Sequence, residues 1–453
     1  MSIPGDSAAR TAAQLDTAAR LNPSLAALIS IFHDDAMACA HAADRAAAEG
    51  RSLGPLHGMT VSIKDNIDVA GRPTTAGAAF LRGNVATQDA PVVARLRAAG
   101  ATIVGKANMA ELAFGSRSYS AVGGQCRNPW APDRIPGGSS GGSAASVAAG
   151  MCTGSLGSDT GGSVRLPAAL NGVTGLRPTL GRVPSRGSVP VSEGHDTIGP
   201  IARSARDVAA IFAVIAGYDE ADRTSVDVAM PDVLGQLDAG VAGLRVGMPR
   251  QHFFEQVEPA VGDAVMAAAR ELERLGAVLV DVDVPMAIEA HLHMTNMVFA
   301  DACHVYRDRL QNAPETITAS VVERMRNGFS VTGLQYAEAV DYARRWRLAL
   351  RRLFADVDLL LSPTTPTQAP PIEDGHNLLE ATRAATRNTY AGAFGGIPGL
   401  SLPCGLTPDG LPVGVQLEAA WWREPLLLRA GCAYQRGTPF HSLRPPTHAA
   451  GAA

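Results

Sequence analysis

The sequence predicts a single large α/β domain, and three observations support this. Strand-like β-branched runs alternate with helix-like segments along the 453 residues. A strand–helix–strand order from residue 59 to 105 indicates parallel pairing. No low-complexity linker or internal repeat divides the chain. We therefore expect one domain over 1–453, with an N-terminal helical arm (1–50), a central core (51–220) and a remainder that belongs to the same domain (221–453).

The expected elements follow from periodicity and from turn residues. Short alternating or β-branched runs predict strands at 59–63, 101–105, 153–156, 243–249, 277–284, 358–362, 397–403 and 412–417. Amphipathic spacing predicts helices at 90–99, 143–150, 204–217, 259–275 and 423–437, with mostly helical chain between 286 and 355. Ser204 is expected to cap its helix. Within the arm, Asn22-Pro23 resembles a helix start, and an apolar stripe indicates a helix through Leu25, Leu28, Ile29 and Phe32.

Composition and charge restrict the class of protein. With 46% hydrophobic residues, 18% charged residues and a net charge of −4, the chain has ample material for a core. The slight acidity and the lack of a Lys/Arg block argue against nucleic acid as the main partner. No apolar run is long enough for a membrane span, and residues 1–13 lack the pattern of a secretory signal. Six scattered cysteines without metal-ligand spacing indicate reduced thiols, so we expect a cytoplasmic protein.

The stretch from Pro136 to Pro167 is the densest concentration of glycine and serine in the chain. It reads PGGSSGGSAASVAAGMCTGSLGSDTGGSVRLP, and Ser139 and Ser163 each follow a pair of glycines. Glycine runs mark tight turns or close approach of the backbone to a ligand. A predicted helix and a predicted strand lie between the two serine loops. Two hydroxyl groups on loops at element ends are typical of a catalytic site carried on a rigid scaffold.

Two chemical interpretations of this stretch fit poorly. A phosphate-binding loop would need G-x-x-x-x-G-K-[ST], and no lysine follows either loop. A Ser-His-Asp esterase is the second interpretation, because Gly137-x-Ser139-x-Gly141 satisfies G-x-S-x-G and His195-Asp196 lies downstream. However, the proline-rich segment 132–136 precedes it where a strand should run. The esterase therefore remains a less favoured alternative.

A serine–serine–lysine system fits better. A serine hydroxyl is a weak nucleophile, and a neutral buried lysine can accept its proton. If that lysine does not reach the nucleophile, a second serine can bridge the two groups, since a hydroxyl both donates and accepts. Lys64, at the end of the predicted strand 59–63, together with Ser139 and Ser163, supplies this set.

These residues resemble the amidase signature family. The resemblance covers Lys64-Asp65, PGGSSGGSAA at 136–145, GSDTGGSVRLPA at 157–168 and NGVTGLRPTLGRVP at 171–184, and more weakly PVGVQL at 412–417. The family has a large mixed twisted sheet surrounded by helices, so we expect that architecture here. The resemblance makes the central core catalytic and implies an amide hydrolase that acts through an acyl-enzyme, without a metal or organic cofactor.

Individual roles follow from the same resemblance. Ser163 is expected to be the nucleophile, Ser139 the bridging serine after a cis Gly138–Ser139 bond, and Lys64 the base. Backbone N–H groups of Thr160, Gly161, Gly162 and Ser163 are expected to bind the oxyanion. Loop support is expected from Gly138, Ser140, Asp159 and Arg165.

The sequences of residues 171–184 and of EGHDTIGPIARS at 193–204 resemble those of stand-alone arylacetamide, mandelamide and indoleacetamide hydrolases. This favours small aryl or alkyl amides, anilides or carbamates, with Phe114, Tyr119 and residues 189–198 as a candidate apolar pocket. The alternative is the glutamine-hydrolysing subunit of a tRNA amidotransferase, in which we expect glutamine at the position of Leu166. A non-catalytic binding subunit is less favoured, because the lysine and both serines are present. The expected partners are a small amide and water, with no nucleic acid and no membrane; the family also contains homodimers.

Overall fold

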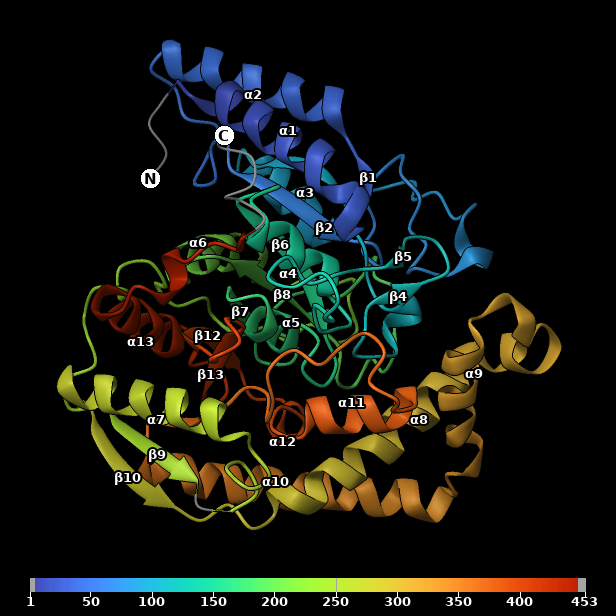
Figure 1. Cartoon of the computed structure of the whole chain (residues 1–453), viewed down its shortest axis with the longest axis vertical. Coiled ribbons are helices and arrows are strands. Elements are labelled where there is room, and N and C mark those ends of the chain that lie inside the picture. Colours follow the sequence, from blue (N-terminus) through green and yellow to red (C-terminus); the bar gives the residue numbers. More distant parts are fainter. Residues whose placement is uncertain (1–4, 250, 447–453) are drawn as a thin grey trace.

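A large mixed sheet flanked by helices forms the centre of the protein, as the sequence predicts (Figure 1). The computed structural model describes residues 5–249 and 251–446, so residues 1–4 of the segment inspected for a signal, and the last residues of the predicted domain, lie outside it. The strands of the sheet are β1 (Leu28–Ile31), β2 (Thr60–Lys64), β3 (Thr102–Ala107), β6 (Gly154–Asp159), β7 (Thr174–Arg177), β8 (Thr197–Ala202), β9 (Arg245–Pro249), β10 (Val278–Val282), β11 (Leu359–Pro363), β12 (Gly399–Leu406) and β13 (Pro412–Ala419).

The strand order is β1-β3-β2-β6-β8-β7-β12-β13-β11-β9-β10. Strands β3, β2 and β6 run parallel, and so do β11, β9 and β10. The central pairs from β6 to β11 are antiparallel, as is β1 on β3. The predicted strand–helix–strand unit is therefore confirmed as parallel pairing of β2 with β3. A separate small ribbon joins β4 (Tyr119–Ser120) to β5 (Gly124–Gln125).

The helices cover the sheet and extend beyond it. They are α1 (Ser7–Leu25), α2 (His33–Ala48), α3 (Pro91–Ala98), α4 (Gly141–Ala148), α5 (Arg165–Leu170), α6 (Ala205–Ile215), α7 (Pro259–Arg274), α8 (Ala287–Asn312), α9 (Ala319–Arg326), α10 (Gly333–Asp356), α11 (Leu378–Thr386), α12 (Tyr390–Gly395) and α13 (Glu424–Gly437). Helices α3, α6, α7 and α13 share the largest apolar cluster with the sheet. Helices α8, α9, α10 and α12 form a second cluster (Figure 1). In the part of the chain described, no helix has the length and apolar content to span a bilayer.

The predicted helix through residues 25–32 is wrong. Helix α1 ends at Leu25, because Ala26 adopts a left-handed conformation (φ 46°). The Asn22 side chain then bonds the backbone of Leu28 twice: Oδ1 accepts from its N–H (2.7 Å) and Nδ2 donates to its carbonyl (2.9 Å). Asn22 therefore ends a helix rather than starting one. The spacing of Leu28, Ile29 and Phe32 suits a helix, but Leu28 and Ile29 lie in β1 on the edge of the sheet, and Phe32 follows that strand.

Most of the other elements match their predictions within a few residues. Ser204 caps α6, since its side chain accepts from the backbone N–H of Asp207 at 3.0 Å. One difference concerns the site. Strand β6 continues to Asp159, three residues beyond the prediction. Its glycines and serines have low strand propensity, but β6 is buried between β2 and β8, where tertiary pairing overrides local preference.

Candidate active site

Lys64 and Ser139 are in direct contact. Lys64 is the last residue of β2, and its side chain is fully buried. Its Nζ lies 2.7 Å from Ser139 Oγ and 2.8 Å from Ser158 Oγ. Ser158 was not predicted from the sequence, although it follows two positions after Leu156 in the same motif. Its hydroxyl also accepts from Asn66 Nδ2 at 3.2 Å, so it orients the lysine.

A second lysine, Lys106 on β3, provides a useful contrast. Both lysines are buried, but Lys106 lies 3.5 Å from Asp65 and donates to the Ile67 carbonyl at 2.7 Å. Lys64 forms no ion pair with any described residue. Burial therefore lowers the pKa of Lys64 to about 7, with Asp159 and Asp196 too weak to restore it. An amine that is neutral near pH 7 can accept a proton, as the predicted role of this lysine requires.

Ser139 is held on a turn that the preceding residues shape. The Gly138–Ser139 peptide bond is cis, as expected from the family resemblance. Ser118, which was not predicted from the sequence, donates to the Gly137 carbonyl at 2.8 Å and accepts from the N–H of Gly141 at 3.0 Å. A Cβ on Gly138 would lie 2.9 Å from the carbonyl oxygen of Gly115, so no larger residue fits there.

The two serine loops are joined by the backbone around Ser140. Its N–H donates to the Ser163 carbonyl at 3.2 Å, and its hydroxyl donates to the Ser158 carbonyl at 3.1 Å. These contacts agree with the loop-support role expected for Ser140. Ser139 is buried, whereas Ser163 is partly exposed at the wall of a cavity. Ser163 therefore borders the cavity, while Ser139 lies next to the lysine.

The expected oxyanion contribution of Gly162 is wrong. Its N–H donates to Asp159 Oδ1 at 2.7 Å, so that group is already occupied. Gly162 has φ +135°, and a Cβ there would lie 2.3 Å from Thr389 Oγ1, so glycine is required for the loop shape. The N–H groups of Gly161 and Ser163 form no hydrogen bond with another described residue. Thr160, the remaining expected donor, precedes them at the end of β6, and its side chain donates to Asp196 at 2.6 Å.

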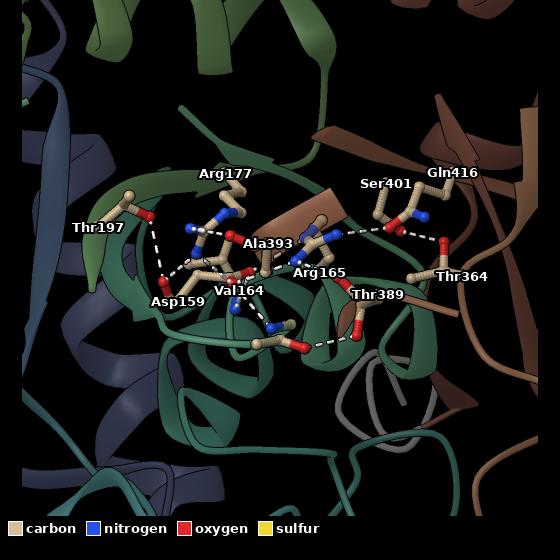
Figure 2. A network of polar contacts seen from close by, with 12 residues as sticks. Asp159, Val164, Arg165, Arg177, Thr197, Thr364, Thr389, Ala393, Ser401 and Gln416 are labelled. Carbon is tan, nitrogen blue, oxygen red and sulfur yellow. Dashed lines mark hydrogen bonds and ion pairs between the residues drawn. The ribbon is translucent and has the colours of Figure 1, made fainter. Parts of the chain in front are cut away.

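Asp159 organises a buried network next to the loop that carries Ser163 (Figure 2). Its carboxylate pairs with Arg165 (3.1 Å) and Arg177 (3.0 Å), and it also accepts from the N–H of Val164 at 3.1 Å. All three ionic side chains are inaccessible to solvent. Burial raises the pKa of Asp159, but the two guanidinium groups and the hydrogen bonds lower it well below its usual range. The carboxylate is therefore ionised and fixes the loop that carries Ser163.

Arg165 extends the network to the C-terminal strands. Its Nη1 donates to Gln416 Oε1 at 2.9 Å (Figure 2). The same Nη1 lies 3.4 Å from Glu418 Oε1, and both partners belong to β13. Burial raises the pKa of Glu418 to about 7. The loop-support roles expected for Asp159 and Arg165 agree with this geometry. The contribution of Arg177 was not foreseen, because nothing near it in the sequence indicates a charge partner.

The histidine of the esterase alternative has different neighbours. His195 Nδ1 lies 2.9 Å from Ser192 Oγ, and burial lowers the pKa of His195 to about 3. Asp196 accepts from Thr160 and from two backbone N–H groups, not from the histidine. The contacts of Ser139 are with Lys64. The residues of the alternative triad are thus not brought together.

A narrow cavity lies in front of Ser163, and its volume of about 30 Å³ is that of about two water molecules. Its wall includes Gly138, Thr160 and Gly161 from the serine loops, and Phe114 and Val191 from the expected apolar pocket. Tyr119 is not part of this wall; it lies on β4 and is 47% exposed. Residues of four helices also form part of the wall: Val298 of α8, Arg324 of α9, Thr382 and Thr386 of α11, and Tyr390 of α12.

The chain belongs to the Amidase family, whose sequence profile matches residues 9–428. It is 40% identical to a protein from Chloroflexus aurantiacus that is named as a subunit of glutamyl-tRNA(Gln) amidotransferase, covering 96% of this chain and 95% of that one. A solved structure described as a vestigial protein complex that reveals the origins of an s-triazine catabolic enzyme is similar with a TM-score of 0.91, 34% identity and 95% coverage of both chains. A peptide amidase with bound chymostatin is similar with a TM-score of 0.84, 35% identity and coverage of 97% and 96%.

These relatives correct one expectation. The sequence led us to expect a stand-alone enzyme whose partners are a small amide and water, without nucleic acid. That expectation is wrong, because relatives that are 39–40% identical are named as subunits of glutamyl-tRNA(Gln) amidotransferase. The expectation of a stand-alone enzyme rested on Leu166 and on the segments 171–184 and 193–204, and the exclusion of nucleic acid rested on the slight acidity and the lack of a Lys/Arg block. A single position beside the serine loop is weaker support than similarity over nearly the whole chain.

Proposed function

We propose that this chain is the amide-hydrolysing subunit of an amidotransferase-type complex, and that it releases ammonia from glutamine through a Ser163 acyl-enzyme. The observation that carries the chemistry is the buried Lys64, which has no ion-pair partner among the described residues and lies 2.7 Å from Ser139 Oγ. The similarity to amidotransferase subunits over 96% of the chain supports the biological context. Hydrolysis of small aryl or alkyl amides is the second candidate, favoured by Phe114 and Val191 in the cavity wall.

The proposed reaction proceeds by acyl transfer. Ser163 Oγ bonds to the carbonyl carbon while its proton passes to Ser139, whose own proton passes to the neutral amine of Lys64. The N–H groups of Gly161 and Ser163 stabilise the oxyanion of the tetrahedral intermediate. The C–N bond then breaks, and the proton on Lys64 returns through Ser139 to the departing nitrogen. Water hydrolyses the Ser163 ester by the same proton route and frees the acid.

An assay of ammonia release from glutamine, phenylacetamide and benzamide tests this proposal. We expect glutamine to be hydrolysed, and we expect Ser163→Ala to abolish the reaction while His195→Ala retains it. Activity in Ser163→Ala would refute the acyl-enzyme. Turnover of phenylacetamide without any turnover of glutamine would leave the serine chemistry intact but contradict the amidotransferase context.

The pH profile of the reaction is the second test. Only the neutral amine of Lys64 accepts a proton, and burial lowers its pKa to about 7. We therefore expect kcat/KM to fall about tenfold per pH unit below pH 7 and to level off above it. A profile without this limb between pH 5 and 9, measured where the protein stays folded, would contradict the role of Lys64 as the base.

A further inference from the structure

A second and larger cavity lies at the other end of α12 from the cavity in front of Ser163. Helix α12 begins at Tyr390, which borders the cavity in front of Ser163, and ends at Gly395, which borders the second one. The second cavity has a volume of about 530 Å³, against about 30 Å³ in front of Ser163. A volume of this size is within the range of cavities that bind small organic ligands. The reaction proposed above uses none of its described wall residues.

Two arginines of α10 give this second cavity its charge. Arg347 and Arg351 lie one helical turn apart, and both border the cavity. Neither of them forms an ion pair or a hydrogen bond with another described residue, whereas Arg345 of the same helix pairs with Asp341 at 3.0 Å. None of the wall residues in the described part of the chain is acidic. Like charges one turn apart on a helix repel each other, so an anion between the two guanidinium groups relieves this repulsion.

Two consecutive tryptophans form the aromatic side of the same cavity. Trp421 and Trp422 are half-buried, and both border the cavity. The Trp421 indole Nε1 donates to the Gly395 carbonyl at 3.0 Å, and the backbone N–H of Trp422 donates to Thr179 Oγ1 at 2.9 Å. Trp422 has a φ of 68°, a left-handed conformation that is rare for so bulky a residue. Large aromatic side chains that are fixed and yet partly exposed are typical of a binding site.

The charged and aromatic groups of the cavity lie next to each other. The guanidinium carbon of Arg351 is 6.0 Å from the centre of the Trp421 ring. A third guanidinium, that of Arg182, lies 4.7 Å from the centre of the Trp422 ring, but Glu424 balances it at 3.8 Å. Arginine binds phosphate oxygens in a bidentate manner, and nucleobases stack on aromatic side chains. Two unpaired arginines balance one phosphate monoester, which carries about 1.5 to 2 negative charges near pH 7.

We infer that this second cavity binds a mononucleotide, with the base on Trp421 and the phosphate on Arg347 and Arg351. The number of cations selects a single nucleotide. A longer nucleic acid is held by a row of basic side chains, and the described wall contains no basic residue besides these two arginines. The site is separate from the one at Ser163, so it adds a binding function to the proposed amide hydrolysis.

Isothermal titration calorimetry with adenosine 5′-monophosphate tests this inference. Adenosine lacks the phosphate and ribose 5-phosphate lacks the base, so the three ligands separate the two halves of the site. We expect the wild type to bind the nucleotide at least about tenfold more tightly than either fragment. Binding of the nucleotide that is no tighter than that of a fragment would overturn the inference. Tighter binding of the RNA trinucleotide CCA than of the mononucleotide would contradict the assignment of the ligand.

Neighbouring arginines of α10 provide a matched pair of variants. Arg351→Met removes a charge from the cavity, whereas Arg352→Met removes the same charge from an exposed residue outside the described wall. We expect Arg351→Met to weaken nucleotide binding about tenfold and Arg352→Met to leave it within about twofold. Equal effects of the two changes would place the nucleotide elsewhere and overturn the inference.

A variant of the aromatic side tests the position of the base. Trp421→Leu is expected to reduce the affinity for the nucleotide to that for ribose 5-phosphate, because stacking is lost. Thermal melts show whether this variant is folded. If it is not, the two arginine variants still decide, since both replace exposed side chains. Unchanged nucleotide binding in folded Trp421→Leu would contradict the stacking of the base on this ring.

Discussion

Replacing Lys64 by methionine is expected to abolish amide hydrolysis and yet leave the protein at least as stable as the wild type. Without the base, neither serine can lose its proton, and removal of one member of such a system reduces kcat by about 10⁴-fold or more. Stability behaves differently. Burial lowers the pKa of Lys64 from 10.5 to about 7, which corresponds to about 1.4 kcal/mol per unit against the protonated amine. The unfolded chain keeps that proton up to pH 10.5, so the wild-type lysine destabilises the fold at pH 8, and methionine removes this effect.

Lys106→Met is the matched control. Lys106 is equally buried, but it neutralises Asp65, so its loss leaves an uncompensated carboxylate and should lower the melting temperature. Activity per folded molecule should persist in this variant. Ammonia release and thermal melts at pH 8 give both quantities for each protein. A Lys64→Met protein that retains more than a few per cent of wild-type activity would contradict the assignment of the base.

The second large effect is expected at Asp159. Asp159→Asn keeps the shape of the side chain but leaves Arg165 and Arg177 as buried cations with too little negative charge around them. Breaking a buried ion pair by removing one partner costs about 3–5 kcal/mol. We therefore expect the free energy of unfolding, measured by urea denaturation, to fall by about this amount.

Asp238→Asn serves as the control for that experiment. Asp238 also contacts two arginines, Arg206 at 2.6 Å and Arg436 at 2.8 Å, but it is 69% exposed. Exposed pairs contribute about 0–1 kcal/mol, so this variant should be nearly unchanged. Equal losses in the two variants would mean that burial does not set the strength of the Asp159 network.

The sequence predicted those features whose cause is local. A β-branched run that ends at Lys64, two glycine-flanked serines and a capping serine at 204 each carry their explanation within a few residues. The prediction of a helix through residues 25–32 failed, because the spacing of their apolar side chains fits a helix as well as an edge strand. Only the pairing of Asn22 with the backbone of Leu28 decides between the two. Strand β6 was predicted too short for a related reason. Its glycines have low strand propensity, and pairing with the neighbouring strands keeps them extended.

The site shows the same division. The family resemblance implied that Gly162 is an oxyanion donor, but the nearby carboxylate of Asp159 accepts its N–H. Arg324 was missed altogether. It lies in a polar segment, VVERMRNG, whose charge suggests a solvent-exposed helix. Its burial depends on Phe114 and Phe299, which come from distant parts of the chain, so no local pattern could have indicated it.

The bond between Arg165 and Gln416 has a consequence for protein synthesis. The loop that carries Ser163 leaves the ribosome early, together with Lys64 and Ser139. Its supporting guanidinium, however, has partners on β13 that are translated 251 and 253 residues later. Lys64, Ser139 and Ser163 are therefore present in the nascent chain long before Arg165 can meet its partners on β13. On the function proposed above, we expect unfinished chains that lack β13 not to hydrolyse amides, because Arg165 then lacks its partners Gln416 and Glu418.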